Sequence, residues 1–419
     1  MAASRRQQLA AAVIGNALEW YDFVVFGFLT VIISRLFFPD ENELLALLKT
    51  TATFGVGFFM RPIGGIALGI YADRHGRKAA LQLIMGLMTL ALLIIACAPP
   101  YAAIGIGAPI LIVVARLLQG FATGGEFAIA TSFLVEIAPR HQRGLYGSMQ
   151  QFGLALAALG GALAGMSVTV LLTPEQLDSW GWRVPFIVGL LIAPVGLYIR
   201  RHLEDPEEFV ASRARQPAQR RSFLAMLALN ARGVVVTFGL IICGTITYYV
   251  LLVYMPTFAR TQLGMSLSDA FKVQVIALLC LSAVVPVFGM LSDRVGRRPV
   301  LIGGCLLLLA ALYPLFARTH AAPGFGSLLL MQVTLCSLLG VYYGAVATAV
   351  AEQFDPRVRS TGLSLAYNLA VMLFGGFAQF FVTLMIDYSG DPLAAAYYVM
   401  FGCVVGLVAA CFVREPRHA

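Results

Sequence analysis

The chain has 419 residues, of which 59% are hydrophobic and only 12% are charged. A soluble domain is charged at about 25% of its positions, so this composition excludes an ordinary soluble fold and favours a membrane protein. The formal net charge is +8, but most cations lie in alternate loops, which is not the pattern of a nucleic-acid-binding patch.

Apolar stretches long enough to cross a bilayer as helices recur along the whole chain. They are residues 10–37, 48–72, 79–98, 105–135, 145–172, 183–202, 230–258, 270–292, 299–318, 324–351, 360–386 and 394–413. The first stretch is too long for the apolar core of a signal peptide. The hydrophilic segment from Arg200 to Arg221 divides the series in two.

We therefore expect an all-α membrane protein with twelve transmembrane helices in two pseudo-symmetric six-helix bundles. The expected units are a first bundle at 1–202, a linker at 203–229 and a second bundle at 230–419. Because Lys and Arg are concentrated in every second loop, both termini and the linker are expected in the cytoplasm. The seven cysteines stand singly in apolar runs, a pattern that predicts neither disulfides nor a metal site, and no cofactor motif is visible.

A charged turn occurs twice. Gly69–Lys78 and Gly289–Arg298 share the pattern G-x-x-x-D-R-x-G-R-[KR], each between two apolar stretches. A second echo places Glu136 and Arg143 after the fourth stretch, and Glu352 and Arg359 after the tenth. These repeats indicate an internal duplication. A basic turn that merely obeys the charge bias of cytoplasmic loops would explain the cations but not the Asp or the glycines.

Five ionisable residues lie well inside the predicted spans of the first bundle. They are Glu19, Asp22, Arg61, Arg116 and Glu126. A charge at the bilayer centre costs about 3 kcal/mol unless it meets a partner or a water-filled cavity. Two arginines would bind a carboxylate ligand through planar guanidinium groups, and a nearby carboxylate could carry a proton. The alternative is a salt-bridge network that only ties three helices together.

Polar side chains within the spans supply further candidates. Gln119 and Gln151 in the first bundle, and Tyr367 and Asn368 in the second, are the preferred ligand contacts; Tyr248 and Tyr249 belong to the same wider set of polar aromatics and amides. Each of these groups is about as well explained by hydrogen bonding between helices. Asp22 is the preferred proton site, since its predicted depth in the bilayer is similar to that of Arg61, with Glu19 and Glu126 as alternatives.

Several stretches resemble the major facilitator superfamily and, within it, the metabolite:proton symporter family. The turn Gly69–Lys78 resembles the superfamily loop signature, and Gly15–Phe23, Met60–Gly65, Arg116–Glu126 and Trp180–Phe186 resemble stretches of the symporter family. The resemblance covers essentially the whole chain. Its pattern is similar to citrate–proton and tricarballylate–proton symporters.

The resemblance implies a secondary transporter of a bacterial inner membrane that works as a monomer, not an enzyme. Its partners would be a proton and a small organic anion, a di- or tricarboxylate with citrate as the first choice. Another small metabolite such as 2-oxoglutarate or shikimate is the alternative. Family members that sense osmolytes carry a long coiled-coil tail, and the short C-terminus here counts against a betaine or proline substrate.

The resemblance also implies a cytoplasmic latch. In the family fold the turn that holds Asp73 lies near Arg143 and near the start of the eleventh span, so the latch would close in the outward-open state. Asp293 and Arg359 would form a weaker counterpart. The candidate gating residues are Gly69, Asp73, Arg74, Arg77, Arg143, Asp293 and Arg359. The alternative is that the glycine and the aspartate only shape a tight turn.

Overall fold

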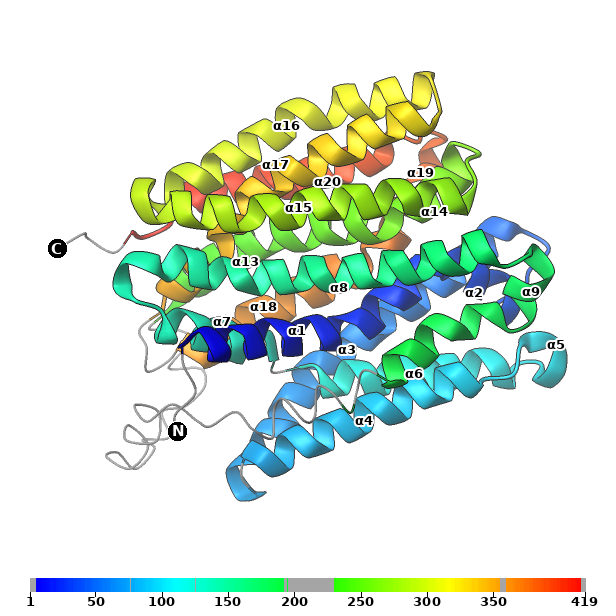
Figure 1. The fold of residues 1–419 in the computed structure, drawn as a ribbon, viewed down its shortest axis with the longest axis horizontal. Coiled ribbons are helices and arrows are strands. Elements are labelled where there is room, and N and C mark those ends of the chain that lie inside the picture. The colour runs from blue at the N-terminus through cyan, green and yellow to red at the C-terminus, as the bar shows by residue number, and fades with distance from the viewer. Residues whose placement is uncertain are drawn as a thin grey trace.

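The computed structural model describes residues 5–75, 77–124, 126–191, 194, 230–354 and 359–415. All regular secondary structure within this part of the chain is helical. The long helices run side by side along the longest axis of the molecule (Figure 1). We call the end that contains Arg143, Arg297 and Arg359 the basic end, and the end that contains α5 and α9 the far end.

The helices of the first half of the chain follow one another in antiparallel order. They are α1 (Arg5–Phe28), α2 (Thr30–Phe37), α3 (Glu43–His75), α4 (Arg77–Cys97), α5 (Tyr101–Ile104), α6 (Gly107–Ala122), α7 (Glu126–Ile137), α8 (Arg143–Leu171) and α9 (Pro174–Ser179), with 3₁₀ turns at Arg140–Gln142 and Gly181–Arg183.

The second half contains two π-helical segments within its spans. Its elements are α13 (Ala231–Thr247), the π-helix η3 (Tyr248–Tyr254), α14 (Met255–Gln262), α15 (Leu267–Val295), α16 (Arg297–Ala321), α17 (Phe325–Glu352), α18 (Arg359–Ala370), the π-helix η4 (Val371–Gly375), α19 (Ala378–Ser389) and α20 (Ala394–Cys411).

Each predicted span is matched by an apolar helical stretch of the described chain, although the first, fourth and sixth differ in their bounds or continuity. Ten helical stretches of the described chain are long and apolar enough to cross a membrane, and the shorter apolar helices Leu83–Cys97 and Gly181–Leu191 correspond to the third and sixth predicted spans. The sixth prediction, 183–202, runs beyond the described residues. The seven cysteines are unpaired, as their spacing predicts.

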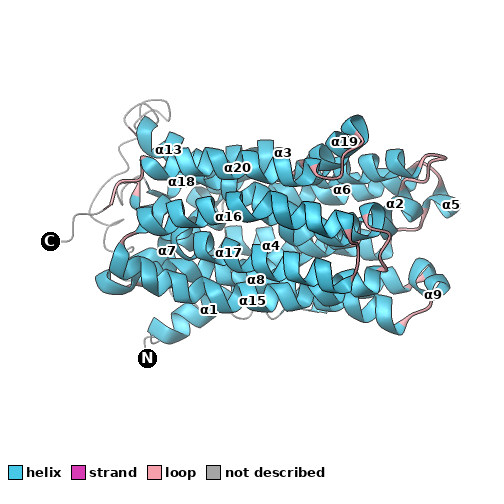
Figure 2. Ribbon diagram, turned by 90° about the horizontal axis from the view of Figure 1, so that it is seen from above, coloured by secondary structure: helices cyan, strands magenta, loops and turns pink. Residues whose placement is uncertain are grey.

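The two halves of the chain lie against each other along their length. In Figure 1 the helices α15, α16, α17 and α20 of the second half lie in the upper part, and α1, α3, α4 and α6 of the first half lie in the lower part. At the boundary α8 packs along α15 and contacts α17, while α3 contacts α19 and α7 contacts α18. Seen from above in Figure 2, the same helices remain nearly parallel. Groups that lie between these pairs therefore face both halves of the molecule.

The first predicted span is shorter than expected. The stretch 10–37 is not one helix, because α1 ends at Phe28 and α2 begins at Thr30. The hydroxyl of Thr30 donates to the carbonyl oxygen of Gly27 over 2.7 Å, and back-bonding of this kind bends helices. The membrane-crossing part is thus α1, and α2 turns away from it at the far end.

The fourth predicted span is also interrupted. Within 105–135, α6 and α7 are separated at Thr123 and Gly124. The N–H of Thr123 still donates to the carbonyl oxygen of Gln119 over 3.2 Å. Position 124 has no room for a side chain, because a Cβ on Gly124 would overlap the carbonyl oxygen of Arg61. The interruption therefore coincides with a close approach of two spans.

Candidate functional site

The second and fourth spans cross through glycine contacts that hold the two buried arginines. A Cβ built on Gly120 would overlap the carbonyl oxygen of Gly57, and one built on Gly57 would lie 2.7 Å from the carbonyl oxygen of Arg116. Nearer the basic end, Gly64 lies against the backbone of Phe121 in the same way. Small residues let helix backbones touch, so this crossing sets the relative height of α3 and α6.

The Arg116 side chain is fully buried among aromatic rings of the first half. Its guanidinium carbon lies 4.7 Å from the ring centroid of Phe23, 4.6 Å from that of Phe26 and 4.7 Å from that of Phe54. Its Nη1 donates to Oε1 of Gln119 over 2.8 Å. Cation–π contacts contribute about 2 kcal/mol when the cation is desolvated, so the rings partly replace the water that the charge has lost.

Arg61 lies in a similar environment and shares one ring with Arg116. Its guanidinium carbon lies 5.0 Å from the centroid of Phe23, 5.1 Å from that of Trp20 and 4.3 Å from that of Phe58. The side chain is 1% exposed. The two cations that the sequence singles out therefore meet around a single aromatic cluster.

Both guanidinium groups keep donors that no described group accepts. Nε and Nη2 of Arg61 and of Arg116 are buried and have no hydrogen-bond partner, and the same holds for Nε2 of Gln119. Buried donors without acceptors cost free energy comparable to a lost hydrogen bond. Five donor atoms are in this state, and four of them belong to the two guanidinium cations. They make a site suited to an anion with several acceptor oxygens.

Asp22 is buried on α1. Its Oδ1 lies against Gly189 of the sixth span, so tightly that a Cβ on that glycine would overlap it. Oδ1 has no hydrogen-bond partner, and Arg116 is the charged residue whose field acts on this carboxylate. The structure thus places Asp22 where α1 packs against the sixth span, and its role as the preferred proton site stays a prediction.

Tyr367 of α18 faces the first half. Its ring is stacked on that of Phe127 at a centroid distance of 3.8 Å and an interplanar angle of 4°. Its hydroxyl group interacts electrostatically with the charges of Arg61 and Glu126. The structure therefore brings Arg61, Glu126 and Tyr367 together. The side chain of Glu19 lies outside the described residues.

Asn368 has a different surrounding from the one expected of a ligand contact. Its Nδ2 donates to the carbonyl oxygen of Gly124 over 2.6 Å and to Oγ of Ser364 over 3.1 Å. Asn368 thus ties α18 to the interruption between α6 and α7, across the two halves. In this conformation its amide N–H groups are used by the protein itself.

The amides of α8 divide into two roles. Gln150 and Asn16 exchange hydrogen bonds of 3.1 Å, which join α8 to α1. Gln151, one residue on, lines a central cavity between the two halves, and its Oε1 has no partner. Gln151 therefore remains a candidate ligand contact, whereas Gln150 is a link between helices.

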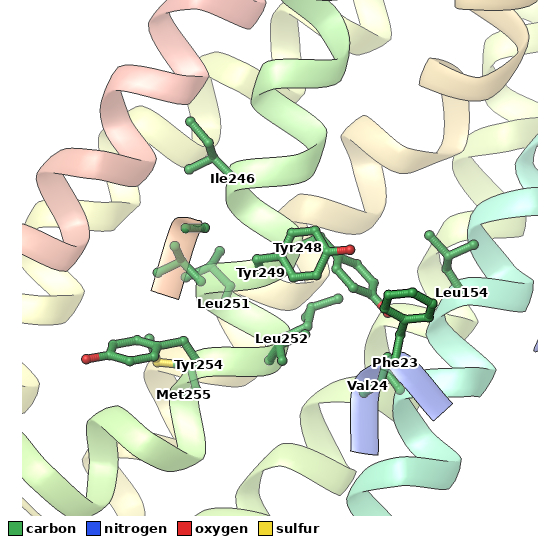
Figure 3. Close-up of a cluster of buried hydrophobic side chains, with 14 of the residues drawn as sticks. Phe23, Val24, Leu154, Ile246, Tyr248, Tyr249, Leu251, Leu252, Tyr254 and Met255 are labelled. Carbon is green, nitrogen blue, oxygen red and sulfur yellow. The ribbon is translucent and has the colours of Figure 1, made fainter. Parts of the chain in front are cut away.

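The central cavity is small and lined mostly by aromatic rings from both halves. Trp20 and Phe127 of the first half face Tyr248, Tyr249 and Tyr367 of the second. Figure 3 shows Phe23 beside the two adjacent tyrosines. The cavity measures about 30 Å³, against roughly 300–1,000 Å³ for sites that hold a small molecule. In this conformation the cavity is therefore smaller than the sites that hold a small molecule.

The cavity is also lined by Tyr248, Tyr249 and Trp20, which are not among the ligand contacts preferred from the sequence. The hydroxyls of Tyr248 and Tyr249 are buried without a partner, and Tyr249 is an electrostatic neighbour of both Arg61 and Arg116. Adjacent tyrosines in an apolar span were a visible signal. Trp20, by contrast, gave none beyond its place in the stretch Gly15–Phe23, since aromatic residues are common in membrane helices.

At the basic end, Asp293 of the second half caps a helix of the first half. Its Oδ1 accepts the N–H of Gly144 over 2.7 Å and its Oδ2 accepts the N–H of Leu145 over 3.0 Å, at the start of α8. Arg297 holds the carboxylate in place through a 3.0 Å ion pair, and its Nε reaches Glu352 at 3.4 Å. A carboxylate at a helix N-terminus is favoured by the helix dipole, so these contacts join the halves.

Arg359 also crosses between the halves, but not by pairing with Asp293. Its Nη1 lies 3.2 Å from Oε1 of Glu136, in the last turn of α7. The carbonyl oxygen of Arg143 accepts the hydroxyl of Thr348 over 3.0 Å. Asp293 and Arg359 thus each make their own contact with the first half, which replaces the single paired counterpart expected from the sequence.

The first copy of the charged turn cannot be compared in the same way. The side chains of Asp73, Arg74 and Arg77 lie outside the described residues, as do the surroundings of Gly69 and all of residue 76. The latch contacts that the structure does describe belong to the second copy.

Aromatic side chains close the far half of the interface. The ring of Phe377 lies against Gly55, where a Cβ would come within 2.7 Å of it, and Phe271 fills the equivalent space at Gly165. Phe271 also meets Phe28 edge to face at 5.8 Å. These aromatic side chains therefore fill the far half of the interface between the two halves.

A family model described as "Sugar (and other) transporter" matches residues 8–228 and 206–418. The chain belongs to this family of the major facilitator superfamily. Members of the family are transporters, and this chain is accordingly a transporter and not an enzyme. The expected family and fold class are therefore confirmed.

Relatives of several specificities resemble this transporter over nearly its full length. A citrate–proton symporter of Klebsiella pneumoniae is 39% identical over 398 residues, which cover 95% of this chain and 89% of the relative. A citrate–proton symporter of Salmonella typhi is 38% identical over 405 residues, 96% and 93% of the two chains. A proline/betaine transporter of Salmonella typhimurium is 32% identical over 422 residues, 99% and 84%.

Solved structures of the superfamily share the fold of this transporter. A D-xylose–proton symporter superposes with a TM-score of 0.78 at 20% identity over 99% of both chains. A proton:xylose symporter of the major facilitator superfamily, bound to a bromodeoxyglucose, gives a TM-score of 0.80 at 19% identity over 98% and 96%. At this identity the likeness concerns the fold alone.

Proposed function

We propose that this symporter takes up a di- or tricarboxylate, with citrate as its main substrate, by alternating access. The observation that carries the proposal is the pair of buried arginines, Arg61 and Arg116, with free guanidinium donors around one aromatic cluster. The citrate–proton symporters among its relatives support the same substrate class.

The charge of the site favours a polycarboxylate over a zwitterion. Two guanidinium groups can each bind a separate carboxylate in a forked geometry. Proline and betaine carry one carboxylate and one cation, so the second arginine would face the substrate's positive charge in a medium of low dielectric constant. We therefore propose that this chain differs in substrate specificity from its proline/betaine relatives.

In this proposal the substrate is bound by residues of both halves. Arg61, Arg116, Gln119 and Gln151 supply donors from the first half, and Tyr367 faces them from the second. Tyr248 and Tyr249 add hydroxyls to the second-half surface of the site, whereas Asn368 acts as a tie between the halves.

Proton coupling in this proposal runs through a carboxylate that competes with the substrate for an arginine. Asp22 lies within the field of Arg116, so protonation of Asp22 would release Arg116 for the substrate. Glu126, near Tyr367 and Arg61, and Glu19 are the other candidates. Because Asp22 and the substrate compete for the same arginine, binding of the proton and binding of the substrate are coupled. This coupling does not require a histidine.

Placement in the cell follows the same proposal. The basic end and both termini face the cytoplasm, as the distribution of Lys and Arg predicts, and the protein works as a monomer in a bacterial inner membrane. The halves 1–202 and 230–419 move about the central site, with 203–229 as their linker. Opening the basic end breaks the contacts of Asp293 and Arg359.

The test is uptake of radiolabelled citrate into proteoliposomes with an imposed pH gradient, inside alkaline. We expect accumulation above the outside concentration that stops when a protonophore removes the gradient. Unlabelled tricarboxylates should compete strongly, and glycine betaine should not. Competition by 2-oxoglutarate or shikimate, but not by tricarboxylates, would assign the alternative substrate.

A further inference from the structure

The π-helix in the seventh span lacks a hydrogen-bond donor that its register requires. In η3 (Tyr248–Tyr254) the i→i+5 pattern assigns the carbonyl oxygen of Leu251 to the N–H of residue 256. Residue 256 is proline, which has no N–H. Leu251 is fully buried in the core, so water does not serve its carbonyl group. An acceptor left in this state costs free energy.

A side chain from another helix supplies the missing donor. Nε2 of Gln332, on α17, donates to the carbonyl oxygen of Leu251 over 3.0 Å. The second hydrogen of the same amide goes to Oε1 of Gln274, on α15, over 2.8 Å. Gln332 and Gln274 are each 1% exposed. Both hydrogens of this buried amide are thus used, one of them on the carbonyl group that Pro256 leaves without a partner.

The segment held in this way is the one that presents the two cavity tyrosines. Tyr248 and Tyr249 open η3, and Figure 3 shows them on the same stretch as Leu251. Tyr249 packs against Phe54 and Phe58, edge to face at 5.7 and 5.5 Å. A change of register in η3 would therefore move the second-half wall of the aromatic cluster that surrounds the arginines.

We infer that Gln332 is a positioning residue for transport: its amide replaces the N–H that Pro256 lacks, and so holds the π-helical turn that carries Tyr248 and Tyr249. The effect on substrate rests on the proposed function, since it is there that these tyrosines contact the substrate. The structural part of the inference, replacement of a proline's missing donor, does not depend on which substrate is carried.

Gln332→Met removes the donor but keeps the length of the side chain, and Pro256→Ala restores the backbone N–H. Amide hydrogen exchange of residues 248–255, followed by mass spectrometry in detergent, reports the turn directly. We expect exchange about 5–150-fold faster in Gln332→Met, the ratio that corresponds to an unsatisfied buried carbonyl. In the double variant Gln332→Met/Pro256→Ala, exchange should return to within about threefold of wild type.

Thr319→Val is the control, because Thr319 is another buried residue of the second half whose side chain donates to a backbone carbonyl oxygen, that of Ser327 over 3.3 Å. It should leave exchange of 248–255 unchanged and should not be rescued by Pro256→Ala. If Gln332→Met does not yield folded protein, recovery of folded protein in the double variant is the same rescue. Equal exchange in wild type and Gln332→Met, or an increase that Pro256→Ala fails to reverse, would overturn the inference.

Transport separates the inference from the proposed function. In proteoliposomes Gln332→Met should raise the KM for citrate about tenfold with a smaller change in maximal rate, and the double variant should restore it. Rescue of exchange in a protein that carries no citrate would leave the positioning role intact and reject the substrate. Rescue of exchange with an unrestored KM would reject the role in transport.

Discussion

Asp293 and Gly144 are joined by a 2.7 Å hydrogen bond that runs from the backbone of one half of the molecule to a side chain of the other. The carboxylate sits at the first turn of α8, where the helix dipole favours negative charge, and a 3.0 Å ion pair with Arg297 fixes its orientation. Closure of the basic end therefore depends on one carboxylate that α15 presents to α8.

We expect Asp293→Asn to shift the resting population towards the open basic end by about 5–150-fold, because a charge-assisted hydrogen bond and an ion pair are lost. A reporter cysteine at Ser148, whose Oγ lies against Gly289 across the same interface, should then react faster with a thiol reagent added at the basic end. The background should lack the exposed Cys97 and Cys411.

Arg35→Ala is the control for this variant, since its ion pair with Asp178 is exposed at the far end. It should leave labelling at Ser148 unchanged. The sequence-based latch predicts that Asp73→Asn acts in the same direction as Asp293→Asn. If both variants were labelled at the wild-type rate, the latch would be rejected, and the glycine and aspartate of each charged turn would only shape a tight turn.

Arg116→Lys should lose almost as much citrate binding as Arg116→Ala. An ammonium group keeps the charge, but it lacks the planar guanidinium group that lies against Phe23, Phe26 and Phe54. It also cannot donate two parallel hydrogen bonds to one carboxylate. Loss of one partner of a buried charged contact costs about 2–5 kcal/mol, so Kd should rise at least about 30-fold in both variants. Isothermal titration with citrate measures this, and near-normal binding by the lysine variant would contradict the guanidinium site.

Arg61→Ala should weaken citrate binding by a similar factor, because Arg61 supplies the second set of unpartnered donors. The informative comparison is with a monocarboxylate such as acetate, whose already weak binding should change less in either single variant. If Arg61→Ala bound citrate as wild type does, the substrate would require only one arginine.

Asp22→Asn should uncouple transport while preserving exchange. The amide cannot take up the proton that would release Arg116, so uphill accumulation in a pH gradient should fall to background. Exchange of citrate between equal internal and external pools should continue at a measurable rate. Normal accumulation in this variant would move proton coupling to Glu126 or Glu19.

Gly120→Ala should unfold or misassemble the first half, because its Cβ would overlap the carbonyl oxygen of Gly57 and neither backbone can retreat. Gly86→Ala on α4 is the matched control, since no atom lies within 4 Å of its Cβ position. Thermal unfolding in detergent should show a large loss for the first variant and a change within about 1 kcal/mol for the second. Equal stability would contradict the glycine crossing.

Much of the fold was predictable from the sequence because membrane helices are limited by bilayer thickness, which apolar length reports directly. The internal repeat and the buried charges were predictable for a related reason, since a charge within a span must have a role. Arg61 and Arg116 do meet around one cluster, as expected. Their aromatic surroundings were not predictable, because the sequence does not specify whether an aromatic residue of a span faces the lipid or a buried cation.

The remaining differences arise where backbone geometry departs from a regular α-helix. The contact of Asp22 with Gly189 could not be predicted, because depth along a helix does not specify direction around it. Asn368 reaches Gly124 because α6 is interrupted there. The register of η3 depends on Pro256 and on Gln332 of another helix, and no local sequence pattern reports a partner that is 76 positions away.

The central cavity of about 30 Å³ has room for about two water molecules. This volume is far below the roughly 300–1,000 Å³ of sites that hold a small molecule, so a substrate can enter only if the lining rings of Trp20, Phe127 and the tyrosines move apart. Part of the free energy of substrate binding is then used to separate these rings. The measured affinity is therefore weaker than the contacts of the loaded site alone would give.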